Sequence, residues 1–313
     1  MILTGMANTP NELLLALKDF LVAEDFTVDK YAAVEGDVAL GYELMTSKNG
    51  SKFNFRSFDN CNPTTNYSGS FHNLGGIAMT CARTFDAGSM WHQQAETASE
   101  NGVALMLGAA SYVFVVKNET ITVYIKNAGD VTTALCFGHL GSGEQFATSS
   151  HLLRGFYSGS DVVDIAESYA VPLFEVSSES FCVLYADGAY LDNAVQVSMS
   201  SEVGMTTTTG GDLDGIPQIS FKETQGEYMR STSELTGITG LIPIDFYVSD
   251  PARKLWRYRG SVEGVHLVNM LHADHEEERD IGGTTYRFVA NLRKASPVNF
   301  GDSIRMSGVA LEV

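Results

Sequence analysis

One strongly marked helix near the start of the chain, followed by a long series of strand patterns, limits the fold more than any other feature of the sequence. Thr9-Pro10-Asn11-Glu12 is typical of a helix start, with an N-cap threonine, a proline at the first helical position and a glutamate placed to close a capping box. Apolar side chains then recur every three or four positions, at Leu13, Leu14, Leu17, Phe20 and Leu21. This spacing predicts a single amphipathic helix that ends within residues 22–24.

Two hairpins are predicted after this helix. Strand-like residues 39–45 and 52–58 flank Asn49-Gly50, a pair that favours a tight hairpin turn because both residues tolerate a positive φ. Residues 112–116 and 121–125 flank a polar turn in the same way. Shorter strands are predicted at 26–28, 135–138, 173–176 and 181–185. Because strands joined by tight turns pair antiparallel, we expect an α+β, β-rich fold with the N-terminal helix packed on an antiparallel sheet.

The composition of the chain suggests three parts. Residues 1–197 are expected to form the N-terminal α+β domain. Residues 198–236 are rich in Thr and Gly, contain few aromatic residues and show no period, so they are interpreted as a polar linker or an extended arm. Residues 237–313 are expected to form a small C-terminal all-β module whose five short strands are 240–248, 255–259, 265–269, 284–290 and 303–311.

The charge balance of the chain is strongly acidic. Lys and Arg number 20 and Asp and Glu number 38, so the formal net charge is −18. A protein that grips nucleic acid through its phosphates needs a basic face, so sequence-specific DNA or RNA binding is not expected. A position beside a channel through which DNA passes remains compatible with this charge, because an acidic wall would repel the DNA.

The cysteines and the apolar segments favour a reducing, cytoplasm-like environment without a membrane contact. Cys61, Cys81, Cys136 and Cys182 are widely spaced and are interpreted as free thiols. Residues 1–17 contain no Lys or Arg and so lack the basic region of a signal peptide. The longest apolar stretch, residues 103–116, is shorter than the roughly 20 residues that a bilayer span requires.

Two segments have residue types that bind metals. His272 and His275, with carboxylates beside them, resemble a metal-ligand cluster, but a solvated acidic loop is the preferred interpretation. Asp212 and Asp214 resemble part of a calcium loop, but the rest of the ligand pattern is missing. We therefore predict no metal or cofactor site, while leaving open whether either pair binds an ion.

No catalytic motif stands out in the sequence. Asp161, Asp164 and Glu167 have the residue type of paired carboxylates in glycoside hydrolysis, but the surface of a helix explains their spacing equally well. Nucleophile-elbow, phosphate-loop, dinucleotide-binding and zinc-protease motifs are all missing from the sequence. The chain is therefore not expected to be an enzyme.

Several short motifs, taken in order along the chain, resemble one known family. The motifs are Leu13-Leu14-x-x-Leu17-x-x-Phe20-Leu21, Phe53-x-Phe55-Arg56, Trp91-His92-Gln93, Tyr112-Val113-Phe114-Val115-Val116-Lys117-Asn118, Phe137-Gly138, Pro172-Leu173, Leu255-Trp256-Arg257-Tyr258, Val262-Glu263-Gly264-Val265 and Ile281-Gly282-Gly283-Thr284-Thr285-Tyr286. In this order the chain is similar to a family of poorly characterised virion structural proteins from tailed bacteriophages. Phe114 stands where that family usually has a tryptophan.

The resemblance implies a structural role in a virion that is assembled in the host cytoplasm. It implies a neck or tail ring component, similar to a tail terminator or collar protein, that forms homo-oligomers and docks to other virion proteins. A baseplate or capsid accessory protein is an alternative. A carbohydrate-binding or hydrolytic virion component is another, and it would require close carboxylates and a cleft with Trp91 or Trp256 exposed.

Overall fold

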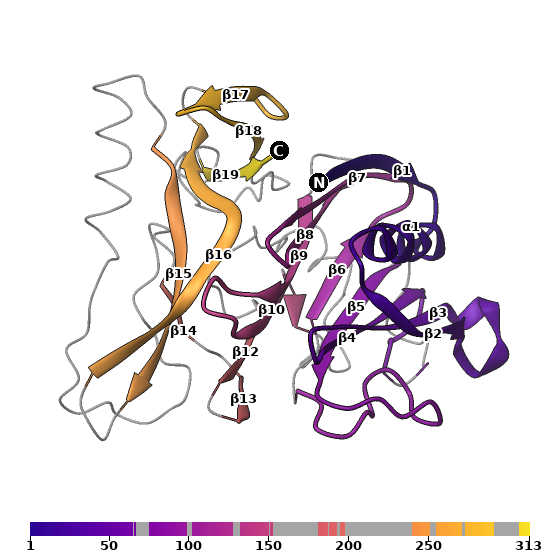
Figure 1. The fold of residues 1–313 in the computed structure, drawn as a ribbon. Helices are drawn as coiled ribbons and strands as arrows, with labels where there is room; N and C mark the ends of the chain where they lie inside the picture. The colour runs from indigo at the N-terminus through magenta and orange to yellow at the C-terminus, as the bar shows by residue number, and fades with distance from the viewer. Residues whose placement is uncertain are drawn as a thin grey trace, which may run out of the picture.

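The fold consists of three antiparallel sheets and a long helix near the N-terminus (Figure 1). The computed structural model describes residues 1–64, 66, 75–98, 102–127, 132–149, 151–152, 181–186, 188–192, 195–197, 240–250, 255–270, 273–290 and 307–313. Within these residues, one α-helix and two short 3-10 helices, Val34–Gly36 and Val38–Leu40, accompany the strands. The expectation of a β-rich α+β fold is confirmed.

Each sheet is described by the order in which its strands are hydrogen-bonded. Sheet A contains β1 (Ile2–Ala7), β7 (Ala110–Lys117), β8 (Thr120–Lys126), β9 (Thr132–His139), β10 (Gln145–Ser149), β12 (Phe181–Ala186) and β13 (Ala189–Asp192). Sheet B contains β11 (His151–Leu152), β6 (Gly102–Met106), β5 (Gly75–Ala82), β4 (Ser51–Asp59), β3 (Tyr42–Lys48) and β2 (Thr27–Ala33). Sheet C contains β14 (Val195–Val197), β15 (Ile242–Asp250), β16 (Leu255–Asn269), β19 (Ser307–Glu312), β18 (Thr284–Ala290) and β17 (Glu278–Ile281).

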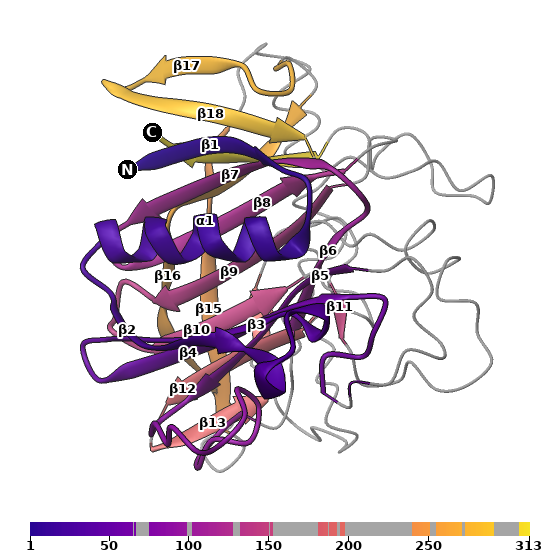
Figure 2. The same cartoon turned by 90° about the vertical axis from the view of Figure 1, so that its right-hand side faces the viewer.

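The helix α1 (Pro10–Ala23) begins as the sequence predicts. The Thr9 side chain accepts a hydrogen bond from the Glu12 backbone N–H at 3.2 Å, and Pro10 occupies the first turn. Its buried face contains the apolar residues predicted from the spacing, and it packs against sheet B and against β1 (Figure 2). Phe20 also meets Phe114 of sheet A, with ring centroids 5.5 Å apart. The helix therefore fills the space between sheets A and B.

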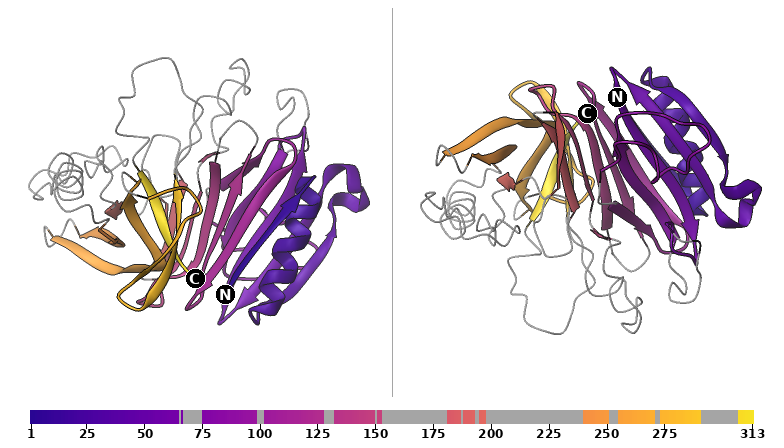
Figure 3. Two further views of the ribbon diagram at one scale, coloured as in Figure 1. Left: turned by 90° about the horizontal axis from the view of Figure 1, so that it is seen from above. Right: turned by 90° about the horizontal axis from the view of Figure 1, so that it is seen from below.

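Sheet A is the middle layer of the molecule (Figure 3). On one face, Phe137 packs against Phe53 and Phe55 of sheet B, with centroids 5.2 and 4.9 Å apart. On the other face, Phe146 packs against Phe246 of sheet C at 5.6 Å. Burial of apolar surface on both faces of one sheet is a large stabilising contribution, at about 25 cal/mol per Å². Over the strands that these two cores cover, both faces of sheet A are therefore buried and cannot contact another molecule.

Both predicted hairpins are confirmed. Asn49 and Gly50 have φ values of 50° and 81° and join β3 to β4. Asn118 and Glu119 have φ values of 44° and 71° and join β7 to β8. Positive φ at both central residues is the conformation that matches the twist of the flanking strands.

Several strand predictions need correction. Residues 255–259 and 265–269 belong to one strand, β16, whose positive-φ residues Gly260 and Gly264 let it bend without ending. Residues 39–40 belong to a 3-10 helix, so the strand predicted there begins at Tyr42. The strands β1, β5, β10, β11, β13, β14 and β17 were not predicted. The strand predicted at 173–176 lies outside the described residues.

The division into domains stays a prediction. Sheet C contains β15 to β19, as expected for the C-terminal module, and also β14, which pairs with β15. Residues 198–236, the predicted linker or arm, lie outside the described residues. Sheet C shares a continuous apolar core with sheet A, in which Val115 and Phe146 meet Phe246 and Val309.

Candidate functional site

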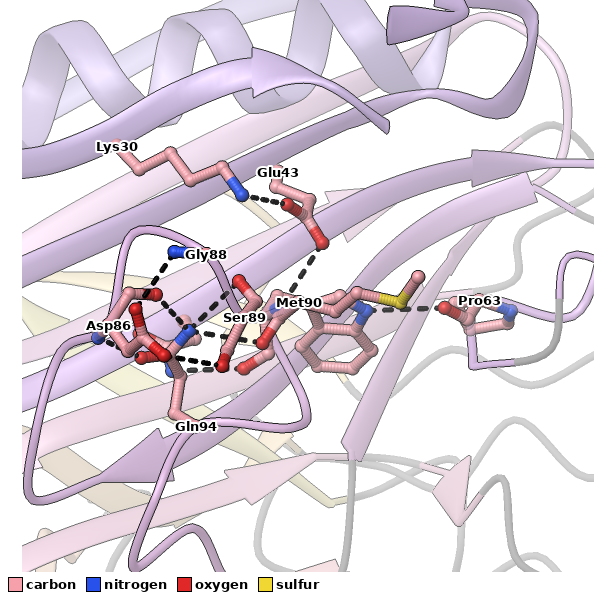
Figure 4. A network of polar contacts seen from close by, with 10 residues as sticks. Lys30, Glu43, Pro63, Asp86, Gly88, Ser89, Met90 and Gln94 are labelled. Carbon is pink, nitrogen blue, oxygen red and sulfur yellow. Dashed lines mark hydrogen bonds and ion pairs between the residues drawn. The ribbon is translucent and has the colours of Figure 1, made fainter. Parts of the chain in front are cut away.

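A buried polar cluster lies on the outer face of sheet B. Glu43 and Arg56 are opposite each other on β3 and β4 and are 3% and 1% exposed. One Glu43 carboxylate oxygen accepts a hydrogen bond from Lys30 Nζ at 2.7 Å, and the other accepts the Trp91 backbone N–H at 3.0 Å (Figure 4). Arg56 donates to the carbonyl oxygens of Leu40, at 2.8 Å, and Pro63. Burial lowers the pKa of Arg56, and the nearby Cys61 and Glu43 oppose that shift.

Residues 83–98, which we call the cover loop, pack over this cluster. Gln94 Nε2 donates to the carbonyl oxygens of Asp86, Ser89 and Met90 at 3.0, 3.1 and 3.2 Å. The Asp86 backbone N–H donates in return to Gln94 Oε1 at 2.6 Å. Figure 4 shows these bonds closing the loop into a compact turn. Hydrogen bonds among its own residues therefore hold the cover loop in this conformation.

Trp91 fastens the cover loop to sheet B. Its side chain is 0% exposed, and its indole N–H donates to the Pro63 carbonyl at 3.2 Å. Its carbonyl accepts from Asn54 Nδ2 at 3.0 Å. An aromatic ring that stacks on a sugar must be accessible, so Trp91 does not meet the requirement of the carbohydrate-binding alternative. The side chain of Trp256 lies outside what the structure describes.

Four side chains form a chain of polar contacts that the sequence analysis did not anticipate: Asn49 and Ser51 beside the β3–β4 turn, Glu119 in the β7–β8 turn and His139 at the end of β9. Ser51 Oγ lies 2.8 Å from His139 Nε2, and His139 Nδ1 lies 3.2 Å from Glu119 Oε2. Asn49 Nδ2 donates to the other Glu119 oxygen. Burial lowers the pKa of His139, and the Glu119 carboxylate partly offsets that shift. This chain of contacts, which we call the hairpin relay, ties the β3–β4 turn of sheet B to the β7–β8 turn of sheet A.

The hairpin relay has the order of groups found in a serine-hydrolase triad, in which a carboxylate orients a histidine that activates a serine. A nucleophile must also reach its substrate, and Ser51 is 5% exposed. No local motif reveals the relay, because Ser51 and His139 are 88 positions apart. The only sequence signals were the two turns, which place Asn49, Ser51 and Glu119, and the predicted strand 135–138, which His139 directly follows.

The metal and carboxylate candidates from the sequence fall mostly outside the described residues. His272, Asp212, Asp214, Asp161, Asp164 and Glu167 all lie outside them. His275 is described, and its Nδ1 accepts the Ala290 backbone N–H at 3.2 Å. The acidic segment beside it is partly a strand, because Glu278–Ile281 forms β17 and Arg287 of β18 pairs with Glu278. Within the described part of the chain, no three His, Cys, Asp or Glu side chains are placed to hold a metal ion.

The thiols and the apolar segments can also be placed. Cys61, Cys81 and Cys136 are free and buried, which confirms that prediction for these three. Burial raises the pKa of Cys81 and that of Cys136 to about 12. Among the helices described here, none has the length and apolar character needed to cross a membrane.

Among the described side chains of sheet A, the most exposed large apolar ones lie on its edge strand β1. Leu3 is 38% exposed and Met6 is 67% exposed. The Met1 amino group donates a hydrogen bond to the Val116 carbonyl oxygen at 3.0 Å, and the Val116 backbone N–H donates to the Met1 carbonyl oxygen at 2.9 Å. Because bonding alternates along an antiparallel pair, Leu3, Gly5 and Ala7 also bond to β7, whereas the N–H and C=O groups of Ile2, Thr4 and Met6 point away from the sheet.

The described residues thus present an accessible strand edge and a shielded triad-like relay. Of these two features, only the β1 edge is exposed to a partner, because Ser51 of the relay is 5% exposed. No protein-family model matches the chain, and no curated protein matches it.

Proposed function

We propose that this chain is a structural subunit of a tailed-phage virion, most simply a neck or tail ring component of the tail-terminator or collar type. It acts by self-assembly and by docking to adjoining virion proteins after synthesis in the host cytoplasm. The observation that carries the proposal is the β1 edge, where exposed Leu3 and Met6 accompany backbone groups that point outward from sheet A. An assembly subunit requires such a docking element, and the motif resemblance to phage virion proteins supports the same role.

The net charge of −18 suits a subunit that lines or adjoins a DNA channel. Acidic surfaces repel phosphate groups, so DNA would pass such a subunit without adhering. A baseplate or capsid accessory position is the alternative location. Antibodies raised against the purified chain and imaged on phage particles distinguish these positions, because the label appears at the neck, the baseplate or the shell.

The test of self-assembly is the mass of the full chain in solution. Native mass spectrometry and negative-stain imaging of the purified protein should show multimers of one defined size, with closed rings among them. A protein that stays monomeric at every concentration tested would refute the assembly role.

A hydrolytic virion component is the second candidate function. The order of groups in the hairpin relay favours it, and it requires that Ser51, which is 5% exposed, become accessible to a substrate. In that role His139 Nε2 would take the proton of Ser51 Oγ as the oxygen adds to an ester or amide carbonyl, and would return that proton to the alcohol or amine that leaves as the ester or amide bond breaks. A fluorophosphonate probe should then label the wild type, fail to label Ser51→Ala, and still label the matched control Ser89→Ala. If the wild type takes up no label, this candidate is excluded.

A further inference from the structure

Among the described residues, the three sheets end in six edge strands: β1 and β13 in sheet A, β2 and β11 in sheet B, and β14 and β17 in sheet C. An edge strand presents unpaired backbone groups and so invites another strand to pair with it. Proteins prevent unwanted pairing by making edges short, by placing charges on them or by introducing bulges. The six edges can be compared on these three features.

Five of the edges carry at least one such feature. The strands β11, β14 and β13 have two, three and four residues. The strand β2 carries Asp29 and Lys30 and has a register shift at Val28/Lys30. The strand β17 has four residues, and Glu278, Arg279 and Asp280 are charged.

The strand β1 has none of these features. It is six residues long, its register with β7 is continuous, and its sequence Ile-Leu-Thr-Gly-Met-Ala contains no charge and no proline. In a chain of net charge −18, a contact between two copies is opposed by repulsion, so it forms most easily where the surface is uncharged. The β1 edge is such a surface.

We propose that β1 pairs antiparallel with β1 of a second copy of this chain, about a two-fold axis at Thr4. In this register Thr4 is opposite the partner's Thr4, and Ile2 is opposite the partner's Met6. Every outward N–H and C=O group of Ile2, Thr4 and Met6 then has a partner, because these residues bond away from β7. Sheet A continues into its counterpart, and the exposed Met6 side chain is covered by the partner's Ile2.

This pairing deepens the proposed function and rests on it, since it names the contact through which a self-assembling subunit forms its first dimer. The interface is isologous, so it closes after two copies. Any larger ring is then built from an even number of chains.

Thr4 is the position at which the pairing is tested. Thr4→Pro removes one outward N–H on each copy, while the bonds of Leu3, Gly5 and Ala7 to β7 remain. We expect the dimer dissociation constant to rise at least about tenfold, as measured by sedimentation or native mass spectrometry. The matched control Thr4→Val keeps the N–H and the shape of the side chain, so its dimer should be unchanged.

A disulfide provides an independent readout. Directly opposed residues in a bonded antiparallel pair have Cα atoms about 5.5 Å apart, which a disulfide can span. Thr4→Cys should therefore give a covalent dimer on oxidation. Leu3→Cys, whose opposite residue is the partner's Gly5, and the wild type should not.

The outcomes separate the two proposals. If the wild type forms multimers that Thr4→Pro does not weaken and Thr4→Cys does not cross-link, the β1 pairing is wrong and the assembly role stands. If the wild type is monomeric throughout, both fail.

Discussion

Removing the Trp91 side chain should destabilise the protein more than most single substitutions do. The indole is 0% exposed beneath the cover loop, so Trp91→Ala leaves a cavity on the outer face of sheet B and removes the hydrogen bond to the Pro63 carbonyl. Loss of a buried Trp or Phe side chain costs about 3–5 kcal/mol of unfolding free energy. Trp91→Phe keeps most of the volume and should cost about 1 kcal/mol for the lost hydrogen bond, because Arg56 still donates to Pro63.

Two assays measure this effect at different scales. Urea unfolding followed by circular dichroism gives the change in global unfolding free energy. Limited trypsin digestion reports local release of the cover loop, because Arg83 lies at its start. Cleavage after Arg83 should be slow in the wild type, faster in Trp91→Phe and fastest in Trp91→Ala.

The matched control is Val38→Ala, because Val38 is 57% exposed and its loss should change stability by less than about 0.5 kcal/mol. A cost below about 1 kcal/mol for Trp91→Ala, with trypsin cleavage at the wild-type rate, would refute the reasoning. Trp91 would then not be the contact that holds the cover loop on sheet B.

Three further outcomes are expected. Burial lowers the pKa of three histidines: His92, His139 and His266. The unfolded chain therefore binds these protons first, so the urea-unfolding free energy should hold above about pH 6.5 and fall as the pH is lowered below it; an unchanged free energy down to pH 5.5 would contradict this. Cys81 and Cys136, with pKa values raised to about 12, should not react with a thiol reagent at pH 8 until urea is added. Gly138→Ala should lower the melting temperature, because Gly138 has φ +122° and a Cβ there would overlap the Glu119 carbonyl; Gly108→Ala, with open space around it, should lower it less.

The sequence predicted the elements whose signals are local. The helix start depends on Thr9 and Pro10 alone, and the first hairpin turn depends on Asn49 and Gly50. The strand β5 was missed because all eight of its residues are buried, so its apolar residues do not alternate with exposed polar ones. The strand β17 was missed because its charged residues suggested a solvated loop, whereas they form cross-strand pairs with β18.

Neither the polar cluster nor the hairpin relay could be predicted from local signals. The Trp91 backbone bonds to Glu43 across 48 positions, and Ser51 meets His139 across 88. The first contact depends on how the cover loop packs on the outer face of sheet B, and the second on how sheets A and B pack. No residue spacing in one sequence encodes such packing. The position of β1 at a sheet edge is likewise set by the strand order. A short apolar strand has the same sequence pattern whether it lies at the edge or in the middle of a sheet.

The layer order explains why the proposed assembly contact and the stability of the cover loop should be separable. Sheet B and α1 cover one face of sheet A and sheet C covers the other, so sheet A can be extended only at its edges (Figure 3). Trp91 lies on the outer face of sheet B, in a core cluster that shares no residue with β1. Trp91→Phe should therefore lower the unfolding free energy of each chain and leave self-association unchanged. Thr4→Pro should weaken self-association and leave the unfolding free energy of the monomer unchanged. Because independent sites act additively, the double variant should show both effects at the size of the single variants. A double variant that departs from this sum by more than about 0.5 kcal/mol would show that the cover loop and the β1 edge are coupled through sheet A.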